Sequence, residues 1–94
     1  MTMDSETVIA RNEDIVAREV GGETVLLDLQ GGTYYGLNEV GGRIWAMLET
    51  DSHSIAAICD VLETEFDAAR GELEADVKAL TADLKENGLV SLTG

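Results

Sequence analysis

The sequence predicts an α+β domain with a winged-helix-like arrangement, in which a three-stranded antiparallel sheet is followed by three helices. In the first half of the chain, segments that alternate apolar and polar residues are separated by paired glycines, which is typical of strands joined by tight turns. The second half spaces its apolar residues three and four positions apart, which is typical of amphipathic helices. Ninety-four residues with 45% apolar content suffice for one modest core.

The expected strands form a meander. Val25, Leu27 and Leu29 fall on one face of a period-two pattern, and Gly21-Gly22 and Gln30-Gly31-Gly32 supply the positive φ angles that tight hairpins need. The first thirteen residues show no such pattern, so we expect a flexible N-terminus over 1–13 and a folded domain over 14–94. The strands are expected at Ile15–Val20, Thr24–Leu29 and Thr33–Leu37, with a short extended piece at Leu89–Leu92.

Capping residues mark the predicted helices. Asn38 is a good N-cap for a helix over 39–49, and Ser54 for one that ends near Phe66. Asp67 is a candidate cap for a third helix over 68–87, and Gly88 stands where a C′ glycine belongs. Trp45 has the spacing of a core residue. The third helix is expected to bury the stripe Leu73, Val77, Leu80 and Leu84.

Charge and composition restrict the partners. The formal net charge is −13, which is explained either by solubility alone or by a basic partner. Such a surface repels phosphate backbones and anionic lipids. We therefore expect no binding to nucleic acid or membrane. No apolar run reaches about 18 residues, the N-terminus lacks a hydrophobic signal region, and one cysteine fits a reducing compartment. The sequence predicts a cytoplasmic protein.

Nothing in the sequence indicates catalysis or a metal site. His53 has no partner with which to form a metal site or a catalytic triad, and Cys59 falls on the apolar stripe of the second helix. The carboxylates are spread too evenly for any pair to be singled out as general acid and base. We therefore predict a protein that is not an enzyme and needs no cofactor.

The strand Thr33–Leu37 is the best candidate for binding. It is short, uncharged and at the end of a meander, so its outer backbone groups need a partner. An extended peptide, the terminal segment Leu89–Leu92 or a second copy of the chain would each serve. Glu72, Asp76 and Asp83 lie along one flank of the third helix, either as an ordinary solvated face or as an acidic rim beside a peptide groove.

The run LLDLQGGTYYGLNEVGGRIWAML resembles the signature of the PqqD-like family, the small peptide chaperones also called RiPP recognition elements. In particular, the TYYGLN segment and the IW that follows are similar to those of the stand-alone B1 proteins of lasso-peptide biosynthesis. The resemblance continues more weakly through SIAAICDVLETEFD and ADVKALTADLKENGLV and covers roughly residues 14 to 92.

The resemblance implies a non-catalytic protein that binds the leader region of a precursor peptide as an added strand and delivers it to a leader peptidase or other modifying enzyme. Two alternatives stay open: a PqqD-type partner of a radical-SAM enzyme, and a dimeric structural or regulatory module using the same edge. A monomer or weak dimer is expected. The implied peptide-binding residues are Thr33, Tyr34, Tyr35, Gly36, Leu37, Leu73, Asp76, Val77, Leu80 and Asp83.

Overall fold

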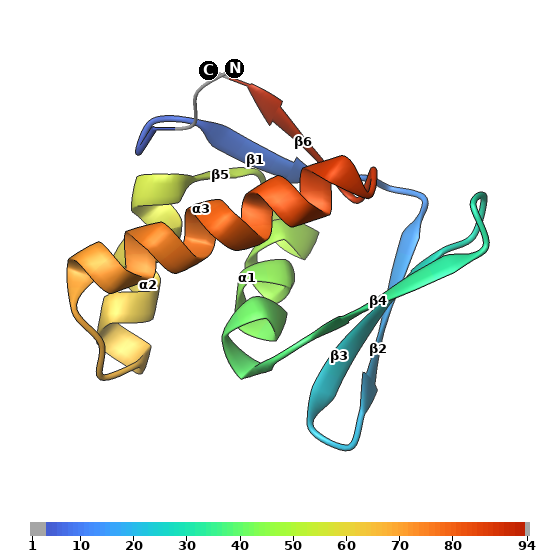
Figure 1. The fold of residues 1–94 in the computed structure, drawn as a ribbon, viewed down its shortest axis with the longest axis horizontal. Coiled ribbons are helices and arrows are strands. Elements are labelled where there is room, and N and C mark those ends of the chain that lie inside the picture. Colours follow the sequence, from blue (N-terminus) through green and yellow to red (C-terminus); the bar gives the residue numbers. More distant parts are fainter. Residues whose placement is uncertain (1–3, 94) are drawn as a thin grey trace.

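The protein is described here by a computed structural model, which covers residues 4–93 and has the α+β fold that the sequence predicts (Figure 1). All strand pairs are antiparallel. The strands are β1 (Val8–Arg11), β2 (Ile15–Val20), β3 (Glu23–Asp28), β4 (Thr33–Leu37), β5 (His53–Ser54) and β6 (Val90–Thr93). The helices are α1 (Glu39–Thr50), α2 (Ile55–Glu65) and α3 (Arg70–Glu86).

The predicted meander is confirmed as a three-stranded sheet in the order β2-β3-β4, which we call the hairpin sheet. Gly21 and Gly22 both have positive φ, 58° and 86°, as the two central residues of a type I′ turn require. In the second turn the Asp28 carboxylate accepts hydrogen bonds from the Gln30 and Gly31 amides, each at 3.0 Å. Figure 1 shows this sheet extending to one side of the helices.

A second sheet, in the order β5-β1-β6, was not predicted. Its central strand β1 lies within the segment expected to be flexible, and that expectation is wrong for Val8–Arg11; residues 1–3 lie outside the described residues. Ile9 is only 1% exposed, and β1 pairs with β6 from Val8↔Thr93 to Arg11↔Val90. The strand forms because its partner comes from the other end of the chain, which no local pattern reveals.

The first two helices begin where the capping residues predict. The Asn38 side chain accepts a hydrogen bond from the Gly41 amide at 2.9 Å, and the Ser54 hydroxyl accepts one from the Ala57 amide at 3.1 Å. Asp67 does not cap the third helix. The N-cap of α3 is Ala69, which makes no side-chain hydrogen bond.

The end of α3 is confirmed in detail. Gly88 has a φ of 75°, and its amide donates to the Lys85 carbonyl at 3.0 Å. The Leu89 amide reaches back to the Leu84 carbonyl at 2.9 Å, which completes a Schellman motif. Leu84 and Leu89 are both buried, so the motif also turns the chain into the core before β6 begins.

The glycine pair of α1 brings the helix close to the hairpin sheet. A Cβ atom on Gly42 would lie 2.6 Å from Thr24 Oγ1, and one on Gly41 would lie 3.2 Å from Leu37 Cβ and 3.3 Å from Leu80 Cδ2. The helix could not pack this closely on β3 and β4 with larger residues. The pair therefore allows α1 to approach the hairpin sheet closely.

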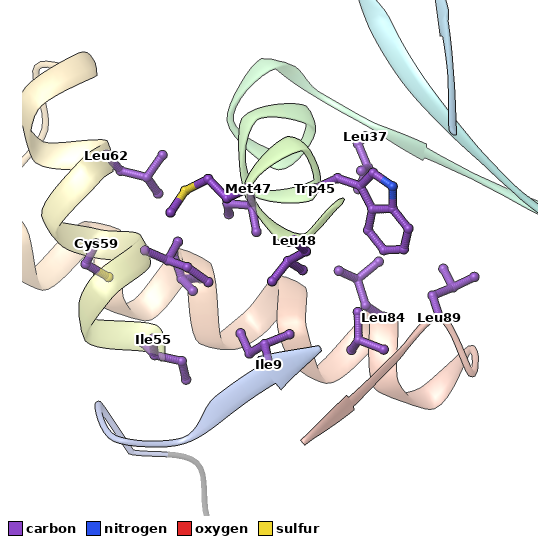
Figure 2. Packing of buried hydrophobic residues seen from close by; sticks show 14 of the residues in the cluster. Ile9, Leu37, Trp45, Met47, Leu48, Ile55, Cys59, Leu62, Leu84 and Leu89 are labelled. Atoms are coloured by element: carbon purple, nitrogen blue, oxygen red, sulfur yellow. The ribbon is translucent and has the colours of Figure 1, made fainter. Parts of the chain in front are cut away.

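The core lies between the helices and the inner faces of both sheets (Figure 2). Trp45 is 1% exposed, which confirms its predicted role in the core. On α3 the predicted stripe is right for Leu73, Val77 and Leu84, but Thr81 is buried in place of Leu80. Leu80 is half-buried at the margin of the core.

Candidate functional site

The strand β4 is an open edge of the hairpin sheet. In residues 4–93 it pairs only with β3, in a register that runs from Thr24↔Leu37 to Asp28↔Thr33. The C-terminal segment pairs with β1, so the alternative that Leu89–Leu92 covers this edge is excluded. Every second residue of an antiparallel strand directs its N–H and C=O groups away from its neighbour, and those of β4 are therefore open to a further strand.

A groove of about 770 Å³ runs beside this edge. One wall is β4 and the other is α3, while α1 supplies the floor and the α2–α3 connection closes one end. Its size falls within the range of ordinary ligand sites. The lining residues are Tyr35, Gly36, Leu37, Asn38, Val40, Gly41, Ile44, Phe66, Asp67, Ala68, Leu73, Asp76, Val77, Ala79, Leu80 and Asp83.

The groove brings together most of the residues that the family resemblance implies. From β4 these are Tyr35, Gly36 and Leu37, and from α3 they are Leu73, Asp76, Val77, Leu80 and Asp83. Thr33 and Tyr34 do not line it. Tyr34 is 77% exposed, and its partner across the sheet is Leu27, on the face directed away from the core.

Sequence reasoning missed the floor and the closed end. Val40 and Ile44 are one helical turn apart on α1, and Phe66 and Ala68 follow α2. The apolar spacing of Val40 and Ile44 is a signal, since it marks a helix face next to the candidate strand. Phe66 carried no such signal, because its place in the groove depends on how α2 and α3 meet.

The rim of the groove is acidic. Asp67, Asp76 and Asp83 line it, and none of the lining residues is Lys or Arg. Burial, and to a lesser extent the Asp83 carboxylate, raise the pKa of the Tyr35 phenol, so this side chain stays neutral and able to donate a hydrogen bond. Glu72 is exposed and does not line the groove. The lining therefore presents apolar side chains with negative charge around them, which favours a cationic ligand.

Two groups of ion pairs hold the end of α2 beside the closed end of the groove. Arg43 Nε lies 2.7 Å from Glu65 Oε1, joining α1 to α2. Arg70 Nη1 lies 2.7 Å from Asp60 Oδ1 and 2.9 Å from Glu63 Oε1, joining α3 to α2. These groups are about one-third exposed or more, so each pair contributes little to the free energy of unfolding. They lie on either side of the connection that carries Phe66.

The two side chains most often used as nucleophile and base lie in ordinary structural positions. Cys59 is buried in the core, and burial raises the pKa of its thiol. His53 is half-buried in β5, opposite Ile9 of β1. In the part of the chain that the structure describes, no group of three His, Cys, Asp or Glu side chains is placed to hold a metal ion. None of the helices described is long and apolar enough to cross a membrane.

The fold and the groove define a small α+β domain that offers one open sheet edge beside a helix. The chain belongs to the PqqD family: the family model described as coenzyme PQQ synthesis protein D matches residues 23–90. This confirms the resemblance carried by the TYYGLN segment. The matched region holds β3, β4 and all three helices, which together supply every wall of the groove.

Two solved structures are similar to the chain over most of its length. One is TbiB1 in complex with the TbiA(beta) leader peptide, at 33% identity and a TM-score of 0.79, covering 87% of this chain and 94% of that one. The other is a lasso peptide synthetase B1 complexed with the leader peptide, at 30% identity and a TM-score of 0.74, covering 88% of this chain and 96% of that one. No curated protein matches the chain.

Proposed function

We propose that this chain binds the leader region of a ribosomally made precursor peptide, of the lasso class, as an added strand on β4. The observation that carries the proposal is the open edge of β4 beside an apolar groove walled by α3. A strand added there would satisfy the free backbone groups of β4, while every second side chain would enter the groove. The leader complexes of the two similar B1 proteins support this reading.

The groove also restricts the chemistry of the peptide. Leu37, Val77 and Leu80 favour large apolar side chains at the positions that face inward. The carboxylates of Asp76 and Asp83 favour basic residues next to them. The bound leader is therefore an extended segment with apolar anchors and flanking Lys or Arg.

In this proposal the protein delivers its cargo and leaves the chemistry to others. It acts as a monomer or weak dimer in the cytoplasm, holding the precursor for a leader peptidase or another modifying enzyme. The gain in rate comes from the raised local concentration of the precursor. A PqqD-type role beside a radical-SAM enzyme is the alternative, and the matching family model is described as coenzyme PQQ synthesis protein D.

The test compares full-length and leaderless precursor as substrates of the processing enzyme encoded beside this chain, each with and without the protein. We expect the protein to raise turnover of the full-length precursor only, and to convert neither substrate on its own. Equal stimulation of both substrates would refute leader recognition. A neighbouring radical-SAM enzyme, in place of a leader peptidase and a cyclase, would favour the alternative.

A further inference from the structure

A second cavity lies beside the hairpin sheet, at the edge opposite to β4. Within residues 4–93 the strand β2 pairs only with β3, so its other edge is open too. Between this edge and α1 lies a cavity of about 410 Å³, which we call the β2 cleft and which falls within the size range of ordinary ligand sites. It shares no lining residue with the groove beside β4, and β2 precedes the residues that the family model matches.

Small residues and free backbone groups leave room for a strand in the β2 cleft. Ala17 on β2 and Gly42 on α1 line it without filling it. In a hairpin closed by a two-residue turn, the residues that flank the turn form a hydrogen-bonded pair, and such pairs alternate along the strands. Val20 and Glu23 form that pair here. The N–H and C=O groups of Ala17 and Glu19 therefore point to the open edge, where an extended segment can pair with them.

The buried side of the cleft carries a hydrogen-bond donor that has no partner. Trp45 lines the cleft and is only 1% exposed, and its indole N–H donates to no acceptor within residues 4–93. Every side-chain nitrogen or oxygen that is sealed from solvent in the described chain has a partner, so this N–H opens onto the surface. Figure 2 shows the indole nitrogen on the side of the ring nearer the hairpin sheet. Because buried indole N–H groups usually donate a hydrogen bond, the cleft favours a ligand that carries an acceptor.

Basic side chains add to this donor. Arg18 and Arg43 line the cleft, whereas the groove beside β4 has no Lys or Arg in its lining. Arg43 uses its Nε for Glu65, at 2.7 Å, which leaves its terminal N–H groups for a ligand. Arg18 takes part in none of the ion pairs formed within residues 4–93. The acceptor that suits the centre of the cleft is therefore a carboxylate.

Acidic residues lie on either side of this basic centre. On α1, Glu39 is in the first turn, Arg43 follows one turn later and Glu49 is in the last turn, and all three line the cleft. With a rise of about 1.5 Å per residue, Glu39 and Glu49 are about 15 Å apart along the helix axis. An extended segment advances about 3.3 Å per residue, so its side chains i and i+4 are about 13 Å apart and face the same side as i+2. A segment with a central anion between two cations at these positions matches the charges of the cleft.

We propose that the β2 cleft binds an extended segment of a partner protein as a strand added to β2. The segment has an Asp or Glu at its centre and a Lys or Arg two residues before and two residues after it. Its carboxylate accepts hydrogen bonds from the Trp45 indole and the Arg43 guanidinium, and its cations lie beside Glu39 and Glu49. This inference goes beyond the proposed function and does not rest on it.

The sequence argues against a second copy of the chain as the occupant. No two of its six basic residues are four positions apart, so the chain does not contain the charge pattern that the cleft requires. Each copy also carries a net charge of −13, which opposes self-association. The basic residues are Arg11, Arg18, Arg43, Arg70, Lys78 and Lys85.

The test titrates the isotope-labelled full chain with the capped peptide Gly-Lys-Thr-Glu-Thr-Lys-Gly and follows two-dimensional NMR spectra. Trp45 is the only tryptophan, so its indole N–H gives a single signal that reports on the cleft. We expect this signal and the amides of Ala17 and Glu19 to shift, with a dissociation constant on the order of 0.1 mM. A peptide of the same composition in the order Gly-Lys-Lys-Thr-Thr-Glu-Gly should bind about tenfold more weakly.

Glu49→Lys tests the charges of the cleft, and Glu86→Lys is its matched control. Both residues are exposed glutamates in the last turn of a helix, but Glu86 is on α3 and does not line the cleft. Glu49→Lys should weaken peptide binding about fivefold at low salt and leave the affinity for labelled leader unchanged, and Glu86→Lys should change neither. Trp45→Phe, once urea denaturation shows it folded, should weaken peptide binding about fivefold through loss of the N–H.

Four results would overturn the proposal. One is a Trp45 indole signal that does not move at millimolar peptide, and another is equal affinity for the two peptides, because the order of charges is what the cleft reads. Binding that is lost in Gly36→Pro but kept in Glu49→Lys would assign the peptide to the groove beside β4. A wild-type dimer that Glu49→Lys converts to monomer in light scattering would assign the edge of β2 to a second copy.

Discussion

Leu80 is the side chain at which peptide binding and stability can best be measured apart. It lines the groove on α3 and is half-buried, whereas Leu84, one turn later, is 2% exposed in the core. Truncating a fully buried leucine to alanine costs about 2–5 kcal/mol of the free energy of unfolding. For Leu80→Ala we expect about 1 kcal/mol, because Leu80 is only half-buried and part of its side chain already faces solvent.

The effect on binding follows from the surface that a bound peptide would cover. Roughly 40 Å² of apolar surface removed from water at about 25 cal/mol per Å² corresponds to about 1 kcal/mol. Leu80→Ala should therefore weaken leader binding about fivefold. Urea denaturation measures the change in stability, and fluorescence anisotropy with a labelled leader peptide measures the change in affinity.

Leu92→Ala is the matched control. Leu92 is also half-buried and packed against the core, but it lies on β6 in the other sheet and does not line the groove. It should lose a similar amount of stability and bind the leader as wild type does. Equal affinities for the two variants would refute the assignment of the groove, since the effect of Leu80 would then be structural alone.

Three further changes test the acidic rim of the groove, the edge of β4 and the packing of α1 on the hairpin sheet. Asp76→Lys should weaken binding of a basic leader by about 1 kcal/mol at low salt and by less at high salt, as measured by titration calorimetry. The control Glu72→Lys makes the same change in net charge outside the groove and should have little effect. A normal affinity for Asp76→Lys would mean that the rim is only a solvated face. Gly36→Pro removes a backbone N–H from β4 and should weaken leader binding. The Cβ added by Gly36→Ala meets nothing within 4 Å, so this variant should bind the leader as wild type does. Circular dichroism must first show that both variants are folded. Gly42→Ala should destabilise the protein by about 1 kcal/mol despite the helix propensity of alanine, because its Cβ would lie 2.6 Å from Thr24 Oγ1. Adding Thr24→Ala should reverse the loss in urea denaturation, and a double variant as unstable as Gly42→Ala alone would mean that this contact is not the cause.

The caps and turns could be predicted because each depends on residues a few positions apart. The Asn38 and Ser54 side chains bond to amides three residues later, and Gly21 and Gly22 need no partner elsewhere to adopt positive φ. The Schellman motif around Gly88 closes within six residues. The candidate strand Thr33–Leu37 followed from the same turns, since they set where the meander ends.

Periodicity alone could not decide which apolar positions are buried. On α3 it favours Leu80, yet Thr81 enters the core and Leu80 lines the groove, because α3 packs against α2 and β6 and these contacts select the buried side. On β3 the alternation marks Val25, Leu27 and Leu29 as an apolar face. The structure buries Leu26 on the opposite face and leaves Leu29 69% exposed, because α1 packs on the side that carries Thr24 and Leu26.

The sequence by itself therefore determined the class of fold, the helix ends other than the start of α3, the turns and the strand left open at the sheet edge, all through interactions between near neighbours. Only the tertiary structure decided that Val8–Arg11 is a strand, since its partner Val90–Thr93 is at the far end of the chain. It also decided the depth and the floor of the groove, which arise where β4, α1 and α3 meet. Those contacts depend on how separate elements pack together, and no pattern within a single element contains that information.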